Sequence, residues 1–172
     1  MGEVHKIETA NHNIPTDLYE ILKGVVDPEI PVLTIMDMGI LRGVKQDSTG
    51  IEVTITPTYS GCPAMEMIAE EIKAALARKG FSNVKIKSVL SPAWTTDWIT
   101  EEGKEKLREY GIAPPAHSTA DKNALLGNPK SVKCPRCKSE HTEMISNFGS
   151  TACKALWKCL DCKEPFDYFK CI

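Results

Sequence analysis

The chain has 172 residues, which is enough for one ordinary domain and a second, small one. Charged residues make up 26% and hydrophobic residues 42%, a composition that excludes a disordered chain. The net charge of −2 excludes a strong overall attraction to nucleic acid or to an anionic membrane. Residues 1–15 lack the features of a signal peptide, and no apolar run approaches the roughly 18 residues of a membrane helix. We therefore expect a cytoplasmic protein.

The first part of the chain alternates between helical and strand patterns. The polar residues 1–13 are expected to form a disordered tail, and the proline-containing stretch 27–39 is expected to form a structured loop. The remaining patterns predict, in chain order, a helix after Pro15, strands at 40–46 and 51–57, a helix at 63–79, a strand at 83–90 and a helix near 100–110. The last strand is expected to lie parallel to the strand before it, because a helix connects them.

The composition changes after Gly111, and this change predicts the domain boundaries. Residues 14–111 are expected to form one α+β domain with the element order α-β-β-α-β-α. Residues 112–131 contain two adjacent prolines and small polar residues without a period, which predicts a linker. Residues 132–172 are expected to form a small β module.

The seven cysteines are unevenly distributed, and four of them form two C-x-x-C pairs. These are Cys134, Cys137, Cys159 and Cys162, with 21 residues between the pairs. Two thiolates on each of two tight turns can complete a tetrahedron around one metal ion, so we expect a structural zinc ribbon. An iron site of the rubredoxin type and a pair of redox dithiols are the alternatives, because four thiolates do not by themselves select the metal.

Two features of the ribbon depart from the usual pattern. Lys138 and Lys163 follow the second cysteine of each pair, where glycine is usual, so a turn with positive φ would be strained there. Cys153 and Cys171 exceed the four ligands that zinc requires. They are either small buried residues on strands or a second thiol site.

Cys62 is the one cysteine in the first 130 residues, and it precedes Pro63 at a predicted helix start. As the N-cap residue, its sulfur would face free backbone N–H groups, which would lower the pKa of the thiol. Asp27, Glu29 and Asp37 either line a site near this thiol or are loop and cap residues. An inert, half-buried cysteine is the alternative interpretation of Cys62.

Five segments, in the same order, resemble one known family. DPEIPVLTIMDMGI (27–40) and TPTYSGCPA (56–64) resemble the SufT-like domain of iron–sulfur cluster assembly factors. The further segments resemble the PaaD-type subunit encoded with the bacterial phenylacetyl-CoA ring epoxidase: SPAWTTDWI (91–99), FGSTACKALWKC (148–159) and EPFDYFKCI (164–172). The resemblance covers about residues 15–172.

The resemblance implies a role in phenylacetate catabolism. Cys62 would be the cluster- or metal-handling residue, bordered by Asp27 and Glu29. The partners would be the epoxidase components, above all the iron–sulfur flavoprotein reductase, whose cluster the protein would help to mature. The resemblance implies no catalysis of the epoxidation itself.

Four functional hypotheses follow from these observations. The first is a maturation factor in which Cys62 transiently binds an iron–sulfur cluster or iron, shares it within a homodimer or with a client, and docks through the ribbon and the aromatic residues Trp94 and Trp98. The second is a structural or adaptor subunit of the oxygenase complex. Thiol catalysis is disfavoured because no histidine lies near Cys62 in the sequence. A nucleic-acid-binding ribbon is disfavoured because acidic residues interrupt its lysines.

Overall fold

A computed structural model of the chain describes residues 15–115 and 131–170. The elements of the first part are α1 (Thr16–Leu22), β1 (Leu41–Asp47), β2 (Gly50–Ile55), α2 (Ala64–Ala77), β3 (Val84–Ser88), the 3-10 turn η2 (Thr96–Trp98) and α3 (Glu101–Tyr110). Four strands follow: β4 (Ile112–Ala113), β5 (Thr142–Ser146), β6 (Lys154–Cys159) and β7 (Pro165–Phe169). The predicted tail at 1–13 lies outside the described residues.

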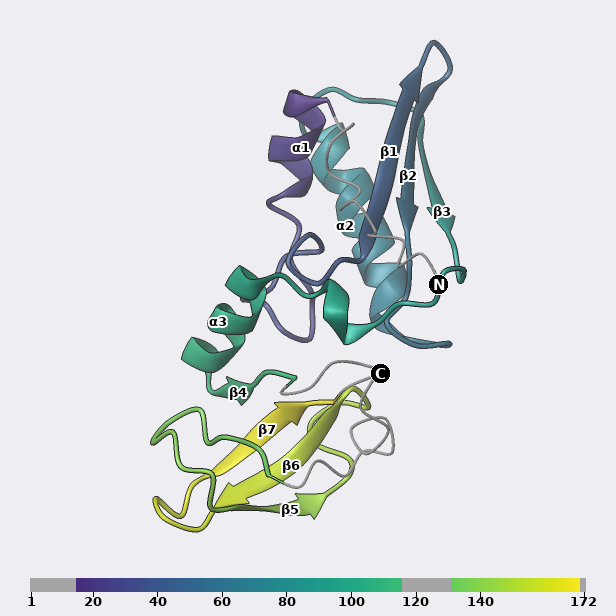
Figure 1. The fold of residues 1–172 in the computed structure, drawn as a ribbon. Coiled ribbons are helices and arrows are strands. Elements are labelled where there is room, and N and C mark those ends of the chain that lie inside the picture. The colour runs from purple at the N-terminus through teal and green to yellow at the C-terminus, as the bar shows by residue number, and fades with distance from the viewer. Residues whose placement is uncertain (1–14, 116–130, 171–172) are drawn as a thin grey trace, which may run out of the picture.

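The first part is an α+β domain built on a three-stranded sheet with the order β1-β2-β3 (Figure 1). β1 and β2 form the predicted antiparallel hairpin, and β3 pairs with β2 in parallel after the chain has passed through α2. The predicted element order α-β-β-α-β-α is therefore confirmed. We call residues 15–111 the assembly domain from here on.

The assembly domain has one continuous apolar core between its helices and its sheet. Alternate residues of β2 are buried, as expected for a strand with one covered face. They meet the apolar side of α2, where Ile68, Ile72 and Leu76 recur at helical spacing and are at most 1% exposed. The loop before β1 adds further buried side chains to this core: Ile30, Leu33, Ile35, Met38 and Ile40.

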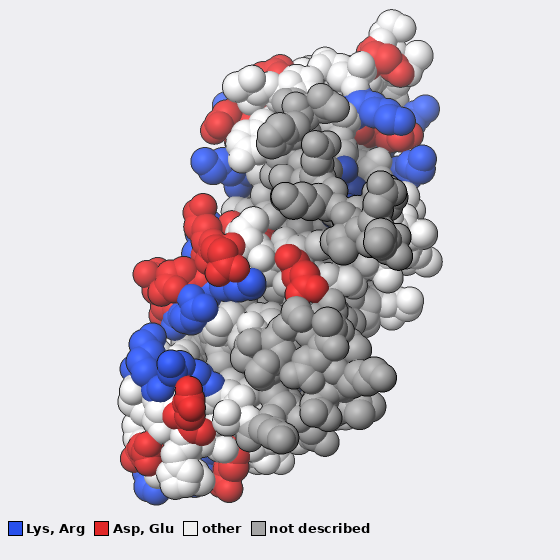
Figure 2. Space-filling view, in the orientation of Figure 1, with Lys and Arg blue, Asp and Glu red and all other residues white. Residues whose placement is uncertain are grey.

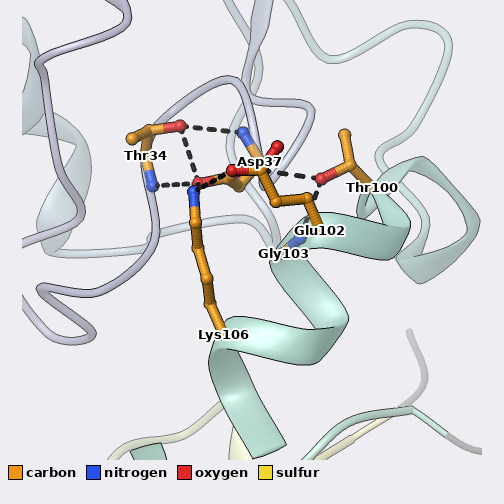
Figure 3. Close-up of polar contacts among 6 residues, drawn as sticks. All are labelled: Thr34, Asp37, Thr100, Glu102, Gly103 and Lys106. Carbon is orange, nitrogen blue, oxygen red and sulfur yellow. Dashed lines mark hydrogen bonds and ion pairs between the residues drawn. The ribbon is translucent and has the colours of Figure 1, made fainter. Parts of the chain in front are cut away.

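Asp37 connects this loop to α3, and Figure 3 shows its partners converging on the carboxylate. The backbone N–H and the hydroxyl of Thr34 each donate to Oδ2 at 2.9 Å. The ammonium of Lys106, on α3, reaches the same oxygen at 2.9 Å. Asp37 is thus a structural residue of the loop. The sequence left open whether it lines a site near Cys62 or stabilises a loop, and its contacts favour the second interpretation.

Gly103 lies inside α3, where a glycine ordinarily weakens a helix. The hydroxyl of Thr100 caps this helix by accepting from the backbone N–H of Gly103 at 2.9 Å. A Cβ atom added at Gly103 would lie 3.1 Å from both the Cβ and the carbonyl oxygen of Asp37. The glycine is therefore needed for the close approach of α3 to the loop.

The second part is a four-stranded sheet with the order β4-β7-β6-β5. β5, β6 and β7 form an antiparallel meander, as expected for a ribbon. β4 pairs in parallel with β7, so Ile112 and Ala113 belong to this sheet and not to a linker. The linker was predicted to begin at 112 because polar, proline-rich residues follow that position. Ile112 and Ala113 are apolar, however, and both are buried directly after the end of α3. Residues 116–130 lie outside the described residues.

The ribbon packs directly onto the assembly domain. Three of its residues, Ile112, Cys153 and Phe169, belong to the apolar core of the assembly domain. The Phe169 ring lies 6.3 Å from the Trp94 ring, measured between centroids. The other buried ribbon residues form a separate, smaller cluster around Trp157 and Tyr168. Among the described residues, no helix is long and apolar enough to cross a membrane.

Candidate functional site

The two C-x-x-C pairs lie on two turns that face each other. Cys134 and Cys137 lie on the turn before β5, whereas Cys159 ends β6 and Cys162 lies on the turn before β7. The four sulfur atoms lie within 4.8 Å of one another, with Cys134 3.8 Å from Cys162 and Cys137 3.5 Å from Cys159. A tetrahedral zinc site with Zn–S distances of about 2.3 Å places its sulfurs about 3.8 Å apart. The four cysteines are therefore close enough together to hold one zinc ion.

The backbone of both turns is strained in the predicted way. Lys138 and Lys163 each have φ of 66°, which is the left-handed conformation that the sequence pattern requires at these positions. This conformation costs a residue with a Cβ of the order of 1 kcal/mol. The ammonium of Lys163 donates to the carbonyl of Leu160 and partly offsets this cost.

The thiols of the four-cysteine centre differ in pKa, and therefore in how readily each one ionises to bind a cation. Backbone N–H bonds, first from Cys162, lower the pKa of Cys159 to about 6 despite its desolvation. The backbone N–H of Glu164 acts in the same direction on Cys162, but desolvation and the neighbouring thiols raise the pKa of Cys162 to about 12. Four crowded sulfurs cannot all ionise without a cation, so a bound metal completes the site.

A polar bridge connects the two turns outside the sulfurs. The hydroxyl of Ser139 and the Nδ1 atom of His141, which follow the first turn, both contact the carboxylate of Asp161 in the second turn. Both His141 and Asp161 are exposed. His141 is therefore a surface residue that steadies the turns and not a metal ligand.

Cys62 lies beside the start of α2, but it is not the N-cap residue that the sequence predicted. It precedes the N-cap residue by one position. The helix begins at Ala64, and Pro63 is the N-cap residue with φ of −68° and ψ of −23°. Because Pro63 already has helical dihedral angles, the carbonyl of Cys62 accepts the first turn's bond from the Met65 N–H at 3.3 Å. Cys62 is half-buried and packs against the apolar core of the assembly domain.

Tyr59 is a site residue that the sequence pattern did not identify. The Cys62 N–H donates to the Tyr59 carbonyl at 3.2 Å, which ties the two residues together in the loop. Burial raises the pKa of Tyr59 to about 12, with further contributions from Cys62, Glu29 and Cys153. The spacing in the sequence could have identified Tyr59, because it precedes Cys62 by three residues in a tight loop, where two side chains at this spacing can point in the same direction.

Asp27 and Glu29 have different roles. Asp27 is 5% exposed, and its Oδ1 atom accepts from the backbone N–H groups of Glu29 and Ile30 at 2.8 Å each. Asp27 therefore holds the loop. Burial raises the pKa of Asp27, and these bonds and the charge of Lys154 oppose that rise. Glu29 is half-buried and presents its carboxylate to the ribbon.

The ribbon brings Cys153 to this carboxylate. The Cys153 sulfur lies 4.0 Å from Oε2 of Glu29 and 3.0 Å from the hydroxyl of Thr151. The residue is 6% exposed, and burial raises the pKa of its thiol. Cys171, the other surplus cysteine, lies outside the described residues. The structure thus places Cys153 beside the assembly domain and away from the four-cysteine centre.

The two tryptophans expected at a docking face are in different environments. Trp94 is 4% exposed, and its indole Nε1 donates to the Met38 carbonyl at 2.7 Å. It packs on Phe169, so it joins the two parts of this chain and is not presented to another protein. Trp98 is half-buried, with the Arg42 guanidinium 3.8 Å from the centroid of its ring.

Among the described residues, the charged side chains on the face shown in Figure 2 do not form a surface of one sign. Figure 2 shows basic and acidic residues interleaved on the visible face. On α3 the cations are paired with carboxylates of the same helix: Lys104 with Glu101, Lys106 with Glu102 and Arg108 with Glu105. This arrangement lacks the basic stripe typical of nucleic-acid-binding proteins.

Two family models match the chain, one for each part. A model described as iron–sulfur cluster assembly protein matches residues 15–87, and a model described as PaaD zinc beta ribbon domain matches residues 118–170. A crystal structure of the domain of unknown function DUF59 from Bacillus anthracis is similar at 26% identity, with a TM-score of 0.49, over 53% of this chain and 88% of that chain.

Relatives with descriptive names also match the chain. An Escherichia coli (strain K12) protein, named as one subunit of a "Putative 1,2-phenylacetyl-CoA epoxidase", is 53% identical over 91% of this chain and 92% of its own length. A Porphyromonas gingivalis (strain ATCC BAA-308 / W83) protein named "Fe-S protein maturation auxiliary factor" is 36% identical over 53% of this chain and 88% of its own length. The chain therefore belongs to the family of this epoxidase subunit, in which an iron–sulfur cluster assembly domain precedes a PaaD zinc β-ribbon domain.

Proposed function

We propose that this protein is a non-catalytic maturation factor of a multicomponent phenylacetyl-CoA monooxygenase and acts in the cytoplasm, where thiols stay reduced. Its cargo is an iron–sulfur cluster or iron, held transiently by Cys62 and delivered to the iron–sulfur flavoprotein reductase. The observation that carries this proposal is the half-buried Cys62 thiol at the start of α2, separate from the four cysteines of the ribbon. The family model described as iron–sulfur cluster assembly protein matches residues 15–87, which contain this cysteine.

The geometry around Cys62 suits a carrier better than a permanent holder. Iron–sulfur clusters are commonly held by four protein ligands, so one thiolate alone binds such a cargo weakly. The four ribbon thiols are within reach of one another and suit a metal of their own. Coordination positions on the cargo therefore remain open for a client, or for the Cys62 of a second copy in a homodimer.

Neighbouring residues prepare the thiol for this task. The carbonyl of Tyr59 accepts a bond from the Cys62 N–H at 3.2 Å and restricts the backbone that carries the thiol. Asp27 fixes the loop that carries Glu29 through two backbone bonds at 2.8 Å. A reductase would dock on the face that contains Trp98 and Arg42, since Trp94 is buried against the ribbon.

Cluster content of the reductase tests this proposal. We would co-express the reductase with the wild-type protein, with Cys62→Ser and with Ser60→Ala, an exposed residue of the same loop that serves as the matched control. Iron and acid-labile sulfide in the isolated reductase should fall with Cys62→Ser and stay at the wild-type level with Ser60→Ala. Full cluster occupancy with a folded, zinc-containing Cys62→Ser protein would overturn the proposal.

An adaptor subunit without cluster transfer is the second candidate. The name of the Escherichia coli relative, as a subunit of an epoxidase, favours it. It predicts stable copurification with the epoxidase components and no effect of Cys62→Ala on reductase cluster content. Loss of cluster without loss of copurification would decide for the carrier.

A further inference from the structure

A cavity of about 280 Å³ lies where α3 meets the turn before β5, and we call it the α3 cavity. Three segments of the chain border it: α3, the two prolines that follow β4, and the ribbon turn. The residues of α3 that line it are Glu101, Lys104 and Arg108, whose spacing places them on one face of the helix. The cavity therefore exists because the ribbon packs beside this helix.

Apolar side chains form much of the wall of the α3 cavity. Val132 is 1% exposed, Pro135 is buried, and Pro114 and Pro115 are half-buried. The backbone N–H of Val132 donates to the hydroxyl of Thr142 at 3.3 Å, and its carbonyl accepts from the same hydroxyl at 2.6 Å. The proline rings also fix the φ angles of the backbone that carries them. The wall is therefore preformed, and it suits the apolar part of a small ligand.

Cations dominate the charged part of the lining. Four cations and one carboxylate border the α3 cavity: Lys104, Arg108, Lys133, Lys138 and Glu101. The side chain of Glu101 is 84% exposed and is paired with Lys104 at 2.7 Å. Figure 2 shows a group of basic side chains where the two parts of the molecule meet, with acidic side chains on either side. The excess of positive charge favours an anion in this cavity.

The four cations are available to such an anion. Within residues 15–115 and 131–170, no carboxylate pairs with the exposed Lys138. Lys133 lies 4.0 Å from Glu140, and both side chains are exposed. Lys104 and Arg108 pair with exposed carboxylates of their own helix. Because exposed ion pairs contribute little free energy, a bound anion can replace these partners at small cost.

We propose that the α3 cavity binds a compact organic anion, a small molecule with an apolar ring or chain and one anionic group. The apolar part lies against Val132 and the prolines, and the anionic group meets Lys133 and Lys138 at the ribbon turn. The volume of about 280 Å³ exceeds the need of an inorganic ion and suits a small molecule. Cys62 does not line the cavity, so this inference goes beyond the proposed function and does not depend on it.

The α3 cavity also borders the metal-binding turn of the ribbon. Cys134, one of the four cysteines of the ribbon centre, is part of its lining and is fully buried. Its backbone N–H donates to the Ser139 carbonyl at 2.8 Å, and its own carbonyl accepts from the Lys138 N–H at 3.0 Å. A ligand that needs this folded turn stabilises it by mass action, so binding should raise the unfolding temperature of the ribbon.

Calorimetric titration of the zinc-loaded full chain tests the proposed site with three probes. The first is 2-naphthoate, which has both an apolar ring system and a carboxylate. The second, 2-naphthamide, keeps the shape and lacks the charge, whereas acetate keeps the charge and lacks the rings. The wild type should bind one 2-naphthoate, and it should bind each of the other two at least about tenfold more weakly. Added salt should weaken the binding of 2-naphthoate.

Charge-removing variants locate the binding. Lys133→Gln combined with Lys138→Gln keeps the length of both side chains and should weaken 2-naphthoate binding about tenfold, with no change for 2-naphthamide. Lys87→Gln, which changes an exposed lysine of β3 outside the cavity, is the matched control and should behave as the wild type. Zinc content and unfolding temperature, measured for every variant, identify a loss of fold.

Several results would overturn the inference. No binding of 2-naphthoate at millimolar concentration would show that the cavity takes no such ligand. Equal affinities for 2-naphthoate and 2-naphthamide, or wild-type affinity in the double variant, would show that the cations are not involved. Tighter binding of a short peptide of aspartate and phenylalanine would assign the cavity to a protein segment and not to a small molecule. None of these results bears on the reductase assay, which decides the proposed function separately.

Discussion

The assembly domain and the ribbon are held together by different physics. The assembly domain has a continuous apolar core between its three α-helices and a three-stranded sheet, reinforced by a carboxylate that ties its loop to α3. The ribbon has only a small apolar cluster of its own, and four cysteines converge at one end of it. A module of this size seldom folds on its core alone. A metal at the four cysteines would therefore serve the fold of the ribbon.

Removal of the ribbon metal should give the largest effect and should separate the two regions. Structural zinc contributes about 10 kcal/mol or more to the folding of small metal-held modules. We therefore expect Cys159→Ser, or a strong chelator, to unfold β5, β6 and β7 and to leave β1, β2 and β3 intact. Hydrogen exchange read by mass spectrometry, with the exposed Ser60→Ala as control, measures this difference. Equal loss of protection in both sheets would contradict the division.

Trp94 tests the junction between the two regions. Trp94→Ala removes a buried ring that packs on Phe169 and should cost about 3–5 kcal/mol of unfolding free energy. Trp94→Phe keeps a ring and loses only the 2.7 Å bond to the Met38 carbonyl, at a cost of about 1–2 kcal/mol. Urea denaturation measures both values. A Trp94→Ala cost below that of Trp94→Phe would show that the ring does not join the two parts.

Asp37 probes the assembly domain without touching the ribbon. Asp37→Ala removes the acceptor of the Thr34 bonds and the partner of Lys106, so we expect a loss of about 2–4 kcal/mol. The control is Glu102→Ala, which removes the exposed partner of the same lysine and should cost at most about 0.5 kcal/mol. Urea unfolding gives both numbers, and the ribbon's zinc content should not change. Similar costs for the two variants would refute a structural role for Asp37.

The carboxylate of Asp37 also makes the unfolding free energy depend on pH, in a direction that follows from its pKa. Burial acts to raise the pKa of Asp37, but hydrogen bonds from the Thr34 backbone and from Lys106 outweigh it and hold the pKa below 3.8. Because the folded-state pKa is lower than the unfolded one, the contribution is complete above about pH 4 and is lost as the pH falls through the folded-state value. The stability difference between the wild type and Asp37→Ala should therefore shrink on acidification below about pH 4. A difference that grows there would mean that the sign is wrong.

The smallest expected effect is a gain of stability in the ribbon. Lys138→Gly relieves the left-handed backbone of an exposed turn residue and should stabilise the metal-loaded ribbon by about 0.5–1 kcal/mol. Lys138→Ala is the matched control, since it keeps a Cβ and therefore the strain. Thermal unfolding followed at the ribbon tryptophan, Trp157, reports the change. If Lys138→Ala stabilises the ribbon as much as Lys138→Gly does, the gain comes from the loss of the lysine side chain and not from relief of the backbone.

Much of the fold could be predicted from local patterns. The hairpin of β1 and β2, the parallel β3 and the helix α2 follow from alternation, helical spacing and turn residues. The positive φ of Lys138 and Lys163 follows from the geometry of two thiolates on one turn. The predicted linker extended too far back because β4 has only two residues, Ile112 and Ala113, and its partner β7 lies far along the chain, at Pro165–Phe169.

The candidate site was less accessible to prediction, since its parts come together only through tertiary packing. The burial of Trp94 depends on the ribbon's Phe169, so its aromatic sequence context alone suggested an exposed docking residue. The proximity of Cys153 to Glu29 depends on the same contact between the two parts. The prediction from sequence also placed the N-cap of α2 one residue too early, at Cys62. Pro63 has helical dihedral angles and takes the N-cap position itself.

Metal and sulfide analysis of anaerobically isolated protein decides whether Cys62 carries a cargo. The wild type and Cys62→Ser should both contain the ribbon zinc, because the four cysteines that hold it lie apart from Cys62. Iron, with or without sulfide, should accompany the wild type alone and should pass from it to reductase that lacks its cluster. Equal iron in the two proteins, or a wild type that restores no cluster in such a reductase, would contradict a carrier role for this thiol.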